Sequence, residues 1–394
     1  MSLEIRPVTR GRDLRAFVDL PFRLYADEPR WVPPLRVERY LYLSRRTGSF
    51  FEHGSARLFL AERDGRVVGR ISAHVDDAYN DHHGARWGWF GFLEVEDDPE
   101  ALQALLGAAE AWLRGRGMER MVGPAEFTVN DGCGVLVEGF DRRPLLRQTW
   151  NRPYLVGLCE AAGLEKAMDM FFWALDVSDR SGMVPILPEL AERSRTEHGM
   201  RLRKMSRRSL RKDLDVFAEV YNEAWASNWG FVPYGPRDLD HYAQELQLAF
   251  DRDWFMVAET PAGEPIGVAI TVPDLNQVLA RMGGRLLPLG WLTFLRRRQI
   301  VDQCRVGFLG VKPEWQHTGV AALMFIEHFD NAARLRIHGG EMGWILETNI
   351  AMNRAMAGMN GHIVRRYRMY ERRFDAGVPP AWPEGARVYD PSRA

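Results

Sequence analysis

Two stretches of the chain share one pattern of apolar and polar residues. Residues 58–71 consist of two short apolar runs that flank a turn at Asp64 and Gly65. Residues 255–270 repeat this arrangement around a turn that contains Gly263. Short apolar runs bounded by Gly, Asp or Pro are typical of β-strands joined by tight turns. Each stretch therefore predicts a β-hairpin.

The similarity between the two halves continues downstream of these hairpins. Residues 91–95 echo residues 307–311, and a predicted helix follows each of them, over 99–116 and 318–336. In the second half, apolar residues recur at intervals of three and four over 214–224, which marks one buried helix face. Each half has the element order β–α–α–β–β–β–α–β–α–β. This internal repeat predicts two α/β domains in tandem.

Length and composition shifts set the predicted domain boundaries. A chain of 394 residues is too long for one ordinary core, so two domains are the default expectation. The segment 177–200 carries Ser, Gly and two Pro residues and is predicted to be a linker. The first domain is then expected at 1–176 and the second at 201–375. The remaining 376–394 is rich in Pro, Gly and Arg and is expected to form a C-terminal tail.

The bulk composition excludes several classes of function. Apolar residues make up 46% of the chain, charged residues 27%, and the formal net charge is −1, so no nucleic-acid partner is expected. Cys133, Cys159 and Cys304 lie far apart, which predicts neither a disulfide framework nor a metal site. Charges interrupt every apolar stretch before the roughly 20 residues that a membrane span requires. The N-terminus lacks the apolar core of a signal peptide, so a soluble, cytoplasmic protein is expected.

One loop in the second half has the features of an anion-binding site. After the apolar strand 307–311, the pattern Gln-x-x-Gly-x-Ala at 316–321 leads into the predicted helix. The first N–H groups of a helix are free to bind an anion, and the helix dipole adds positive potential there. Gly319 lets the backbone approach a ligand closely, and Ala321 keeps the first helical turn slim. A pyrophosphate group would fit this loop.

Residues 201–375 resemble the GNAT superfamily of acyl-CoA-dependent N-acyltransferases. The strand, loop and helix just described are similar to the pyrophosphate-binding element of that superfamily. The segment 342–359 continues the resemblance with a strand, Asn349 and a short helix, and residues 365–371 look like the closing strand. The first half matches by element order and by its hairpin. The resemblance implies an α/β fold with two tandem acyl-CoA N-acyltransferase-like domains, each a mixed, mostly antiparallel sheet flanked by helices.

The same resemblance implies acetyl-CoA or another acyl-CoA as cosubstrate, and no metal. The pantetheine amides would pair with the strand edge as an added strand does, and a backbone N–H there would stabilise the oxyanion. The amine would attack the thioester directly, without a covalent enzyme intermediate. The residues assigned to acyl-CoA in this way are Leu309, Gly310, Val311, Gln316, His317, Thr318, Gly319, Val320, Ala321 and Asn349.

Only a few residues are candidates for proton transfer. Glu347 ends a strand beside the expected thioester channel, where it is either a general base or a carboxylate favoured by the helix dipole. Glu259 ends a central strand, where either a base or a salt bridge is expected. Members of the superfamily often carry a Tyr that protonates the leaving thiolate. Counted from Asn349, that position falls at or near Met356, no Tyr lies between 345 and 366, and Tyr367 or Tyr370 would have to substitute.

The first copy differs at the loop that matters for the cofactor. Its equivalent of the 316–321 loop is 96–100, which contains four carboxylates and no Gly-x-Ala pattern. These negative charges would repel a pyrophosphate. The N-terminal copy is therefore expected to be degenerate and to bind no CoA.

The acceptor is expected to be a primary amine on a small molecule or a peptide. In the GNAT fold, the connection between the first two helices commonly lines the acceptor site, and here it contains Asn228, Trp229 and Tyr234. Asp274 and Asn276 follow a strand exit, where they either bind substrate or mark a turn.

The sequence thus predicts a GNAT-type N-acyltransferase that moves an acetyl or longer acyl group from acyl-CoA to a primary amine. One alternative is a non-catalytic acyl-CoA sensor, which the missing Tyr suggests. Another is an acyltransferase with an acyl carrier protein or an aminoacyl-tRNA as donor, although the net charge near zero argues against tRNA. The apolar insertion 286–295 fits either an acyl tunnel or a homodimer contact.

Overall fold

The computed structural model describes residues 2–9, 11–177, 180–335 and 337–393, which divide into two compact units. Unit 1 comprises Met1–Met170, Leu279–Thr293 and Arg365–Ala386, and unit 2 comprises Phe171–Val278, Phe294–Val364 and Arg387–Ala394. The chain passes from unit 1 into unit 2 inside strand β7 (Glu165–Asp176) and back inside strand β13 (His362–Arg373), and the segment Leu279–Thr293 between them also belongs to unit 1. Each of these two strands therefore supplies one part to each unit.

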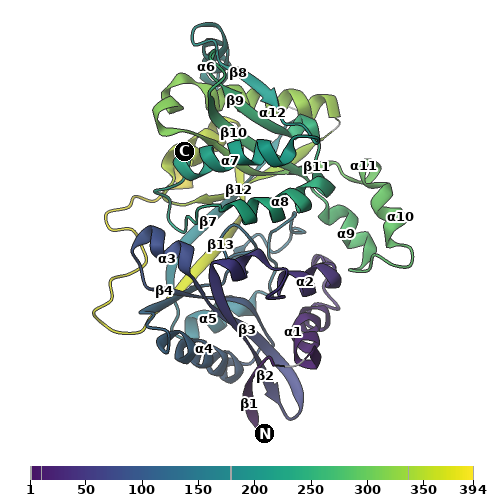
Figure 1. The fold of residues 1–394 in the computed structure, drawn as a ribbon, viewed down its shortest axis with the longest axis vertical. Coiled ribbons are helices and arrows are strands. Elements are labelled where there is room, and N and C mark those ends of the chain that lie inside the picture. Colours follow the sequence, from purple (N-terminus) through teal and green to yellow (C-terminus); the bar gives the residue numbers. More distant parts are fainter. Residues whose placement is uncertain (1, 10, 178–179, 336, 394) are drawn as a thin grey trace. The chain divides into compact units, whose positions relative to one another are not determined.

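The sheet of unit 1 has the strand order β1-β2-β3-β4-β5-β13 (Figure 1). The bounds are β1 (Leu3–Pro7), β2 (Gly54–Arg63), β3 (Arg66–Asp76), β4 (Trp87–Val95) and β5 (Arg120–Gly123), and β6 (Val135–Glu138) also pairs with β13. Neighbouring strands are antiparallel, except that β4 and β5 are parallel. β2 and β3 join through Asp64 and Gly65, whose φ angles of 50° and 80° suit the predicted tight hairpin.

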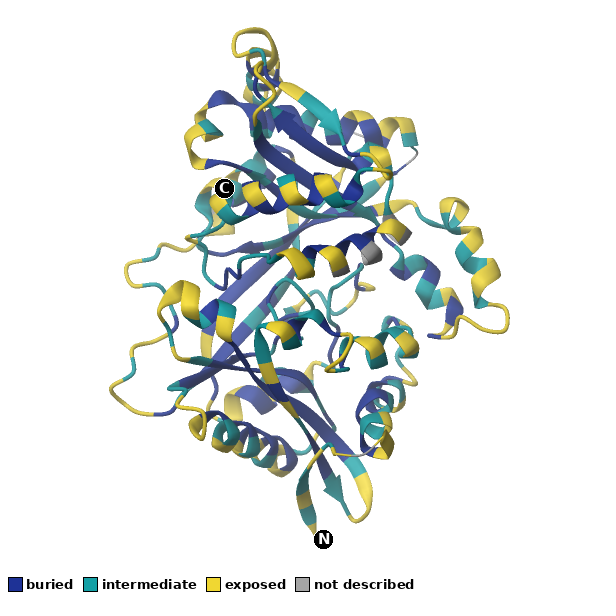
Figure 2. Ribbon diagram, viewed as in Figure 1, coloured by how far each residue is buried: buried dark blue, intermediate teal, exposed yellow. Residues whose placement is uncertain are grey.

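Helices pack on both faces of this sheet. They are α1 (Gly11–Leu24), α2 (Arg36–Tyr42), α3 (Asp77–His83), α4 (Pro99–Arg114) and α5 (Tyr154–Ala161), with the 3₁₀ turn η1 (Ser49–Glu52). Phe59 and Ala61 of β2 belong to the core that contains α4, whereas Leu60 between them belongs to the core that contains α1. Because both faces are covered, the central strands are buried along most of their length (Figure 2).

The sheet of unit 2 has the strand order β7-β12-β11-β10-β9-β8. Its further strands are β8 (Arg201–Lys204), β9 (Phe255–Glu259), β10 (Pro265–Pro273), β11 (Gln303–Val311) and β12 (Gly339–Leu346), and β11 is parallel to β12. The helices that follow in the chain are α6 (Ile186–Thr196), α7 (Leu210–Ala224), α8 (Pro236–Ala249), α9 (Asn276–Met282), α10 (Gly290–Leu295), α11 (Arg297–Ile300), α12 (Val320–Leu335) and α13 (Ile350–Gly358). The 3₁₀ turns are η2 (Arg252–Trp254), η3 (Pro313–Thr318) and η4 (Pro391–Arg393).

The strand register confirms that the two units are copies of one fold. In unit 1, β3 and β4 pair Gly69 with Val95, and in unit 2, β10 and β11 pair Gly267 with Val311. Both pairs contain a register shift a few residues further on, which places a bulge in β4 and in β11. The predicted fold class, two tandem α/β domains with mixed, mostly antiparallel sheets, is therefore confirmed.

The end of β13 belongs to unit 1, although the sequence predicts that residues 365–371 close the second domain. Tyr370 of β13 pairs with Gly123 of β5. A buried ion pair between Arg120 Nη1 and Glu371 Oε2, 3.0 Å apart, holds the two strands in this register. The pattern of apolar residues identifies a strand but not the sheet edge that it joins, which is why the predicted boundary differs.

The segment predicted as a linker, 177–200, contains helix α6. Ala191 and Ser194 of α6 are buried, and the helix packs against α12 within unit 2. The two prolines that suggest a loop stand at the helix start, Pro185 just before it and Pro188 in its first turn. A proline costs a helix little there, because the first N–H groups have no intrahelical partner.

Candidate functional site

Strands β11 and β12 separate partway along their length. They pair in parallel up to Val306 and Met342. Beyond that point β11 stays paired with β10, and within the described residues no strand pairs with its other edge. The backbone groups along that edge can bind the amides of an extended ligand, as an added strand would. The predicted cofactor-binding residues Leu309, Gly310 and Val311 lie on this edge.

The predicted anion-binding loop is η3, which follows β11 directly and leads into α12. Gln316 and His317 are exposed on this turn, and Thr318 is buried. Val320 and Ala321 stand in the first turn of α12. The N-terminus of α12 thus comes directly after the open edge of β11, and a helix start favours an anion.

Gly319 has a structural reason to be glycine. Its φ is +76°, and a Cβ there would lie 2.6 Å from the carbonyl oxygen of Leu190 in α6. This φ and this close approach disfavour any other residue, whether or not a ligand binds. The glycine in the Gln-x-x-Gly-x-Ala pattern therefore supports the packing of α6 and is not by itself evidence for a pyrophosphate site.

Lys312, next to the loop, is a cation that two carboxylates already neutralise. Its Nζ lies 2.7 Å from Glu219 Oε1 and 3.1 Å from Glu223 Oε1, both on α7. Its side chain is 6% exposed. The positive potential at the loop consequently rests on backbone N–H groups and the dipole of α12.

Asn349 and Met356 stand at the start and in the middle of α13. Asn349 is the N-cap of this helix, and its Oδ1 accepts a hydrogen bond from the Met352 N–H at 3.1 Å. Its side chain is held just beyond the end of β12. Met356 is completely buried in the core of unit 2, so an apolar group fills the position where the superfamily often has a Tyr.

Some predicted acceptor residues lie close to the open edge of β11. Tyr234, in the loop between α7 and α8, packs against Phe308 of β11, with ring centroids 6.4 Å apart. Asn228 and Trp229 belong to the same loop and are partly exposed. This loop is therefore in a position to line an acceptor site beside β11.

Asp274 and Asn276 lie elsewhere. The Asp274 N–H donates to the carbonyl of Gln303 at the beginning of β11, about 25 Å along the strand from the anion-binding loop. Asp274 Oδ1 accepts from the Asn276 N–H at 3.2 Å, which is the local contact of a turn. The structure supports the turn interpretation of these two residues.

Glu259 belongs to an ion-pair cluster that unit 1 repeats. Arg203 lies 2.6 Å from Glu259 and 2.6 Å from Asp213 of α7. In unit 1, Arg6 bridges Glu62 and an aspartate of α1 in the same way, at 2.8 and 2.5 Å. Because the copy with the acidic loop has the cluster too, it serves the fold. The salt-bridge interpretation of Glu259 is therefore the better one.

Glu347 and Tyr367 lie in different units. Glu347 follows the last residue of β12 in unit 2 and is 2% exposed, and its carbonyl accepts from the Tyr389 N–H at 2.8 Å. Tyr367 lies in unit 1, where its hydroxyl donates to the Thr149 carbonyl at 2.7 Å. Glu347 stays a candidate base beside the open strands, whereas Tyr367 stabilises the packing of unit 1.

In unit 1, the helix start that corresponds to the anion-binding loop carries its own carboxylate. Asp98 caps α4, because its Oδ1 accepts from the Ala101 N–H at 3.0 Å. Arg63 Nε lies 2.9 Å from Asp98 Oδ2. This carboxylate occupies the place that an anionic ligand would take. The geometry favours the expectation that unit 1 binds no CoA pyrophosphate, which stays a prediction.

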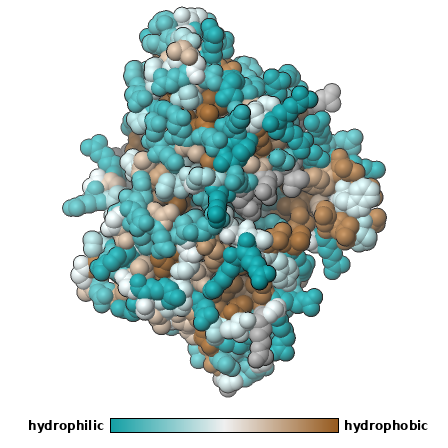
Figure 3. Space-filling view, in the orientation of Figure 1, coloured by the Kyte–Doolittle hydropathy of each residue, from teal (hydrophilic) through white to brown (hydrophobic). Residues whose placement is uncertain are grey.

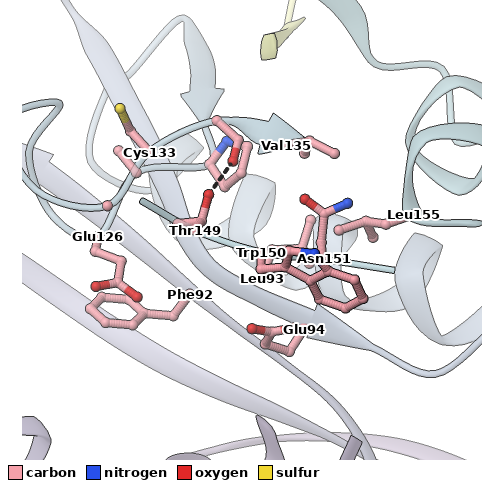
Figure 4. Close-up of a pocket in the computed structure, with 14 residues that line it drawn as sticks. Phe92, Leu93, Glu94, Glu126, Cys133, Val135, Thr149, Trp150, Asn151 and Leu155 are labelled. Carbon is pink, nitrogen blue, oxygen red and sulfur yellow. Dashed lines mark hydrogen bonds between the residues drawn. The ribbon is translucent and has the colours of Figure 1, made fainter. Parts of the chain in front are cut away.

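Unit 1 does contain a cavity, which sequence reasoning missed. The volume of this cavity is about 40 Å³. It lies beside β4, at the point beyond Trp89 where β4 separates from β5. Its wall includes Phe92, Leu93, Glu94, Glu126, Cys133, Val135, Thr149, Trp150, Asn151 and Leu155 (Figure 4). The opening between parallel strands is the counterpart of the one between β11 and β12.

Glu94 brings a largely buried carboxyl group to this cavity, with its side chain 14% exposed. The Tyr25 hydroxyl donates to Glu94 Oε2, and Arg70 Nη2 lies 3.8 Å from Oε1. Burial raises the pKa of Glu94 to about 7, although Arg70 and the hydrogen bond from Tyr25 act in the opposite direction. A carboxyl group that titrates near neutral pH is suited to bind an amine or to accept its proton.

The repeat is the signal that could have revealed Glu94. The strand register equates Glu94 with Gly310 of unit 2. A Cβ at Gly310 would lie 2.0 Å from the ring of Trp225, the residue after α7, and Tyr25 stands at the same place after α1. Unit 1 therefore has a polar cluster of Tyr25, Arg70 and Glu94 where unit 2 has an aromatic ring over a glycine.

No established protein-family profile matches the chain. Two curated proteins are similar over almost its whole length. Protein YghO of Escherichia coli K12 is 32% identical over 374 residues, which cover 93% of this chain and 95% of YghO. The bacterial ceramide synthase of Caulobacter vibrioides is 34% identical over 380 residues, which cover 94% of this chain and 97% of that protein.

Solved structures share the fold at much lower identity. A tandem GNAT protein from the clavulanic acid biosynthesis pathway superposes with a TM-score of 0.57 at 15% identity, over 96% of this chain and all of that chain. A GCN5-related N-acetyltransferase from Sphaerobacter thermophilus gives a TM-score of 0.53 at 13% identity, over 97% of this chain and 98% of that chain. The protein therefore has the tandem GNAT fold of acyltransferases, and it belongs to the family that contains bacterial ceramide synthase and YghO.

Proposed function

We propose that this protein is an N-acyltransferase that joins the acyl group of an acyl-CoA to the primary amine of a long-chain base. The observation that carries the proposal is the open edge of β11 between Val306 and the start of α12. The relative named a ceramide synthase suggests the acceptor. A ceramide is an amide between a fatty acid and a long-chain amino alcohol, so its synthesis is an N-acylation.

The open edge fits an acyl-CoA in two respects. Leu309, Gly310 and Val311 offer backbone groups to the pantetheine amides. The loop from Gln316 to Ala321 offers helix N–H groups to the pyrophosphate, and Asn349 stands at the end of the facing strand. Because Lys312 is bound by two glutamates, pyrophosphate binding would rest on backbone N–H donors. Such donors recognise the ligand by the fixed positions of their hydrogen bonds and not by a net positive charge.

The proposed reaction is direct. The amine nitrogen attacks the thioester carbon, the C–N bond forms and the C–S bond breaks. The nitrogen loses one proton, and the CoA thiolate takes up one. A backbone N–H on β11 that donates to the oxyanion would lower the barrier by about 3 kcal/mol. Glu347 is the proposed base, and the loop with Asn228, Trp229 and Tyr234 is the proposed acceptor wall.

Amide synthesis by the purified protein tests the proposal. The protein is incubated with sphinganine and acyl-CoA of 2 to 18 carbons, and N-acylsphinganine is measured by mass spectrometry beside the release of free thiol. We expect amide and thiol in equal amounts, and no thiol without the amine. Binding of acyl-CoA without turnover would favour the sensor alternative. Amide formed only from an acyl carrier protein donor would exclude acyl-CoA as the donor.

A matched pair of substitutions on α12 tests the pyrophosphate site. Ala321→Glu puts a carboxylate in the first turn, and we expect it to raise the KM for acyl-CoA about tenfold or more because like charges repel. Ala333→Glu, exposed near the other end of the same helix, is the control and should leave the KM unchanged. An acidic residue in the first turn favours the helix, but Ala321 packs against the core, so thermal unfolding of both variants checks that they are folded. Equal KM values would argue against the site.

A further inference from the structure

The cavity of unit 1 has no part in the chemistry proposed so far, yet it is equipped to bind a ligand. A volume of about 40 Å³ has room for about three water-sized groups. Glu94 and Glu126 contribute carboxylates, and Leu93, Val135 and Leu155 contribute apolar surface (Figure 4). A small polar head joined to a hydrocarbon would satisfy both parts of the wall.

Trp150 carries a hydrogen-bond donor in this wall that has no partner. Its side chain is 5% exposed, and within the described residues its Nε1 has no hydrogen-bond acceptor. The Tyr25 ring packs edge-on against it, with centroids 5.5 Å apart at 86°, so the indole is held in place. The indole N–H can only donate, and a buried donor without an acceptor is unfavourable. The ligand of this cavity should therefore present an acceptor oxygen.

The carboxyl groups in the wall favour a ligand with a cationic group. Arg39 Nη1 lies 2.7 Å from Glu126 Oε2, so that carboxylate is already paired. Glu94 has a weaker partner, since Arg70 Nη2 is 3.8 Å away while Arg70 Nη1 donates to the Phe17 carbonyl at 2.7 Å. An ammonium ion beside Glu94 would supply the close, charge-assisted hydrogen bonds that Arg70 does not.

We infer that this cavity binds the head of a long-chain amino alcohol, with the ammonium group at Glu94 and the neighbouring oxygen on Trp150 Nε1. The identity of the ligand rests on the proposed function. With room for about three water-sized groups, the cavity holds only the polar head, and the hydrocarbon lies outside it. The site is defined by unit 1 alone.

The pH dependence of binding follows from the groups that face Glu94. These are Tyr25 after α1, Arg70 on β3, Glu126 after β5 and Tyr154 on α5. Burial raises the pKa of both tyrosines, so neither ionises between pH 6 and 8. Glu94 loses its proton across pH 7, and we expect ammonium binding to strengthen over this range.

Calorimetric titration without any thioester tests the site. The probes are 2-aminooctan-1-ol, octylamine, which lacks the hydroxyl, and octane-1,2-diol, which lacks the amine. We expect the amino alcohol to bind most tightly at pH 8. Glu94→Gln should weaken binding of the amino alcohol at least tenfold. Trp150→Phe should weaken binding of the amino alcohol and leave binding of octylamine unchanged. Glu100→Gln, an exposed carboxylate paired with Arg63, is the control and should change nothing.

The two proposals fail in different ways. If Glu94→Gln and Trp150→Phe both bind the amino alcohol as the unchanged protein does, the site is overturned. If binding responds as expected but no amide forms from any thioester, the site stands and the acyl-transfer proposal falls. If amide forms but neither variant binds the amino alcohol more weakly in the calorimetric titration, acyl transfer stands and the site falls. Thermal unfolding of each variant shows that it is folded.

A second inference rests on the insertion between β10 and β11, which contains α9, α10 and α11. Of the eleven large apolar side chains that are exposed among the described residues, six lie in this insertion. They are Leu286, Leu287, Leu289, Trp291, Leu292 and Leu295. Figure 3 shows apolar side chains gathered on this part of the surface. Single exposed apolar residues are ordinary, but a group of this kind marks a binding surface.

The charge of the insertion identifies the partner. Residues 275–301 contain five arginines and no acidic residue, in a chain whose net charge is −1. Exposed Leu and Trp beside Arg are typical of segments that lie in the headgroup region of an anionic bilayer. No helix in the described part of the chain is long and apolar enough to cross a bilayer. We propose that 286–298 docks on an anionic membrane.

Vesicle flotation tests this surface. We expect the protein to float with vesicles of phosphatidylcholine and phosphatidylglycerol at 7:3, and not with phosphatidylcholine alone. The double variant L287D/L289D should lose most of this binding. The control V184D/I186D alters two apolar residues of unit 2 that are also exposed and should retain it. Equal flotation of both variants, or a dimer that L287D/L289D dissociates without any change in flotation, would overturn the proposal.

Discussion

Gly91→Ala is expected to lower the free energy of unfolding by about 3 kcal/mol, because β4 meets other backbone at this residue. A Cβ on Gly91 would lie 1.6 Å from the carbonyl oxygen of Ala125, and backbone cannot move aside as a flexible side chain can. The Ala125 N–H donates to the Phe90 carbonyl at 2.9 Å, so the same shift would break that bond. Chemical denaturation should show the loss, with a fall in Tm of roughly 6–12 °C.

Gly307→Ala is the matched control, since the repeat places Gly307 where Gly91 stands. A Cβ there would lie 3.6 Å from the nearest atom, the Ile270 carbonyl oxygen, which is an ordinary contact. We expect this variant to unfold within about 1 kcal/mol of the unchanged protein. Equal stability losses at the two positions would contradict the prediction, which rests on backbone lying against Gly91 but not against Gly307.

Glu94→Gln is expected to change how stability depends on pH. Burial raises the pKa of Glu94 to about 7, above its value in the unfolded chain, so the native state holds a proton between about pH 4.5 and 7 that the unfolded state has lost. Stability from this group is therefore complete below that range and is lost as the pH rises through 7. The loss amounts to about 3 kcal/mol at pH 8 relative to pH 4.5.

The glutamine variant cannot titrate, so its stability should fall less between pH 5 and 8 than that of the unchanged protein. Urea denaturation at each pH measures the difference between the two curves, which removes the contribution of every other titrating group. The comparison of slopes also cancels the constant cost of leaving Arg70 without a carboxylate partner. Parallel curves would show that Glu94 has no elevated pKa.

Sequence patterns predict the local elements of this fold well. The predicted helix 318–336 is α12 at 320–335, and the predicted strand 342–346 lies within β12. These elements depend on neighbours in the chain, which a periodic pattern captures. Helix α6 is not predicted, because its prolines are typical of loops. Its packing against α12 depends on residues far away in the chain, which a local pattern does not contain.

The site is less predictable than the fold, because it depends on residues far apart in the chain. Glu259 is a candidate base until Arg203, 56 residues away, is seen to hold it. Glu94 has no motif and becomes notable through Tyr25, 69 residues away. The role of such a residue depends on which partners the fold places beside it. The sequence alone does not show which residues are close in space.

The exchange of strand segments has a consequence for synthesis on the ribosome. Met121 and Val122 of β5 are completely buried, and β13 covers the edge that they form. β13 is made long after β5, so the sheet of unit 1 is completed only after most of unit 2 has been synthesised. A cut of the gene between residues 176 and 201 would therefore leave β13 on the C-terminal piece, and the N-terminal piece would lack the strand that completes its sheet.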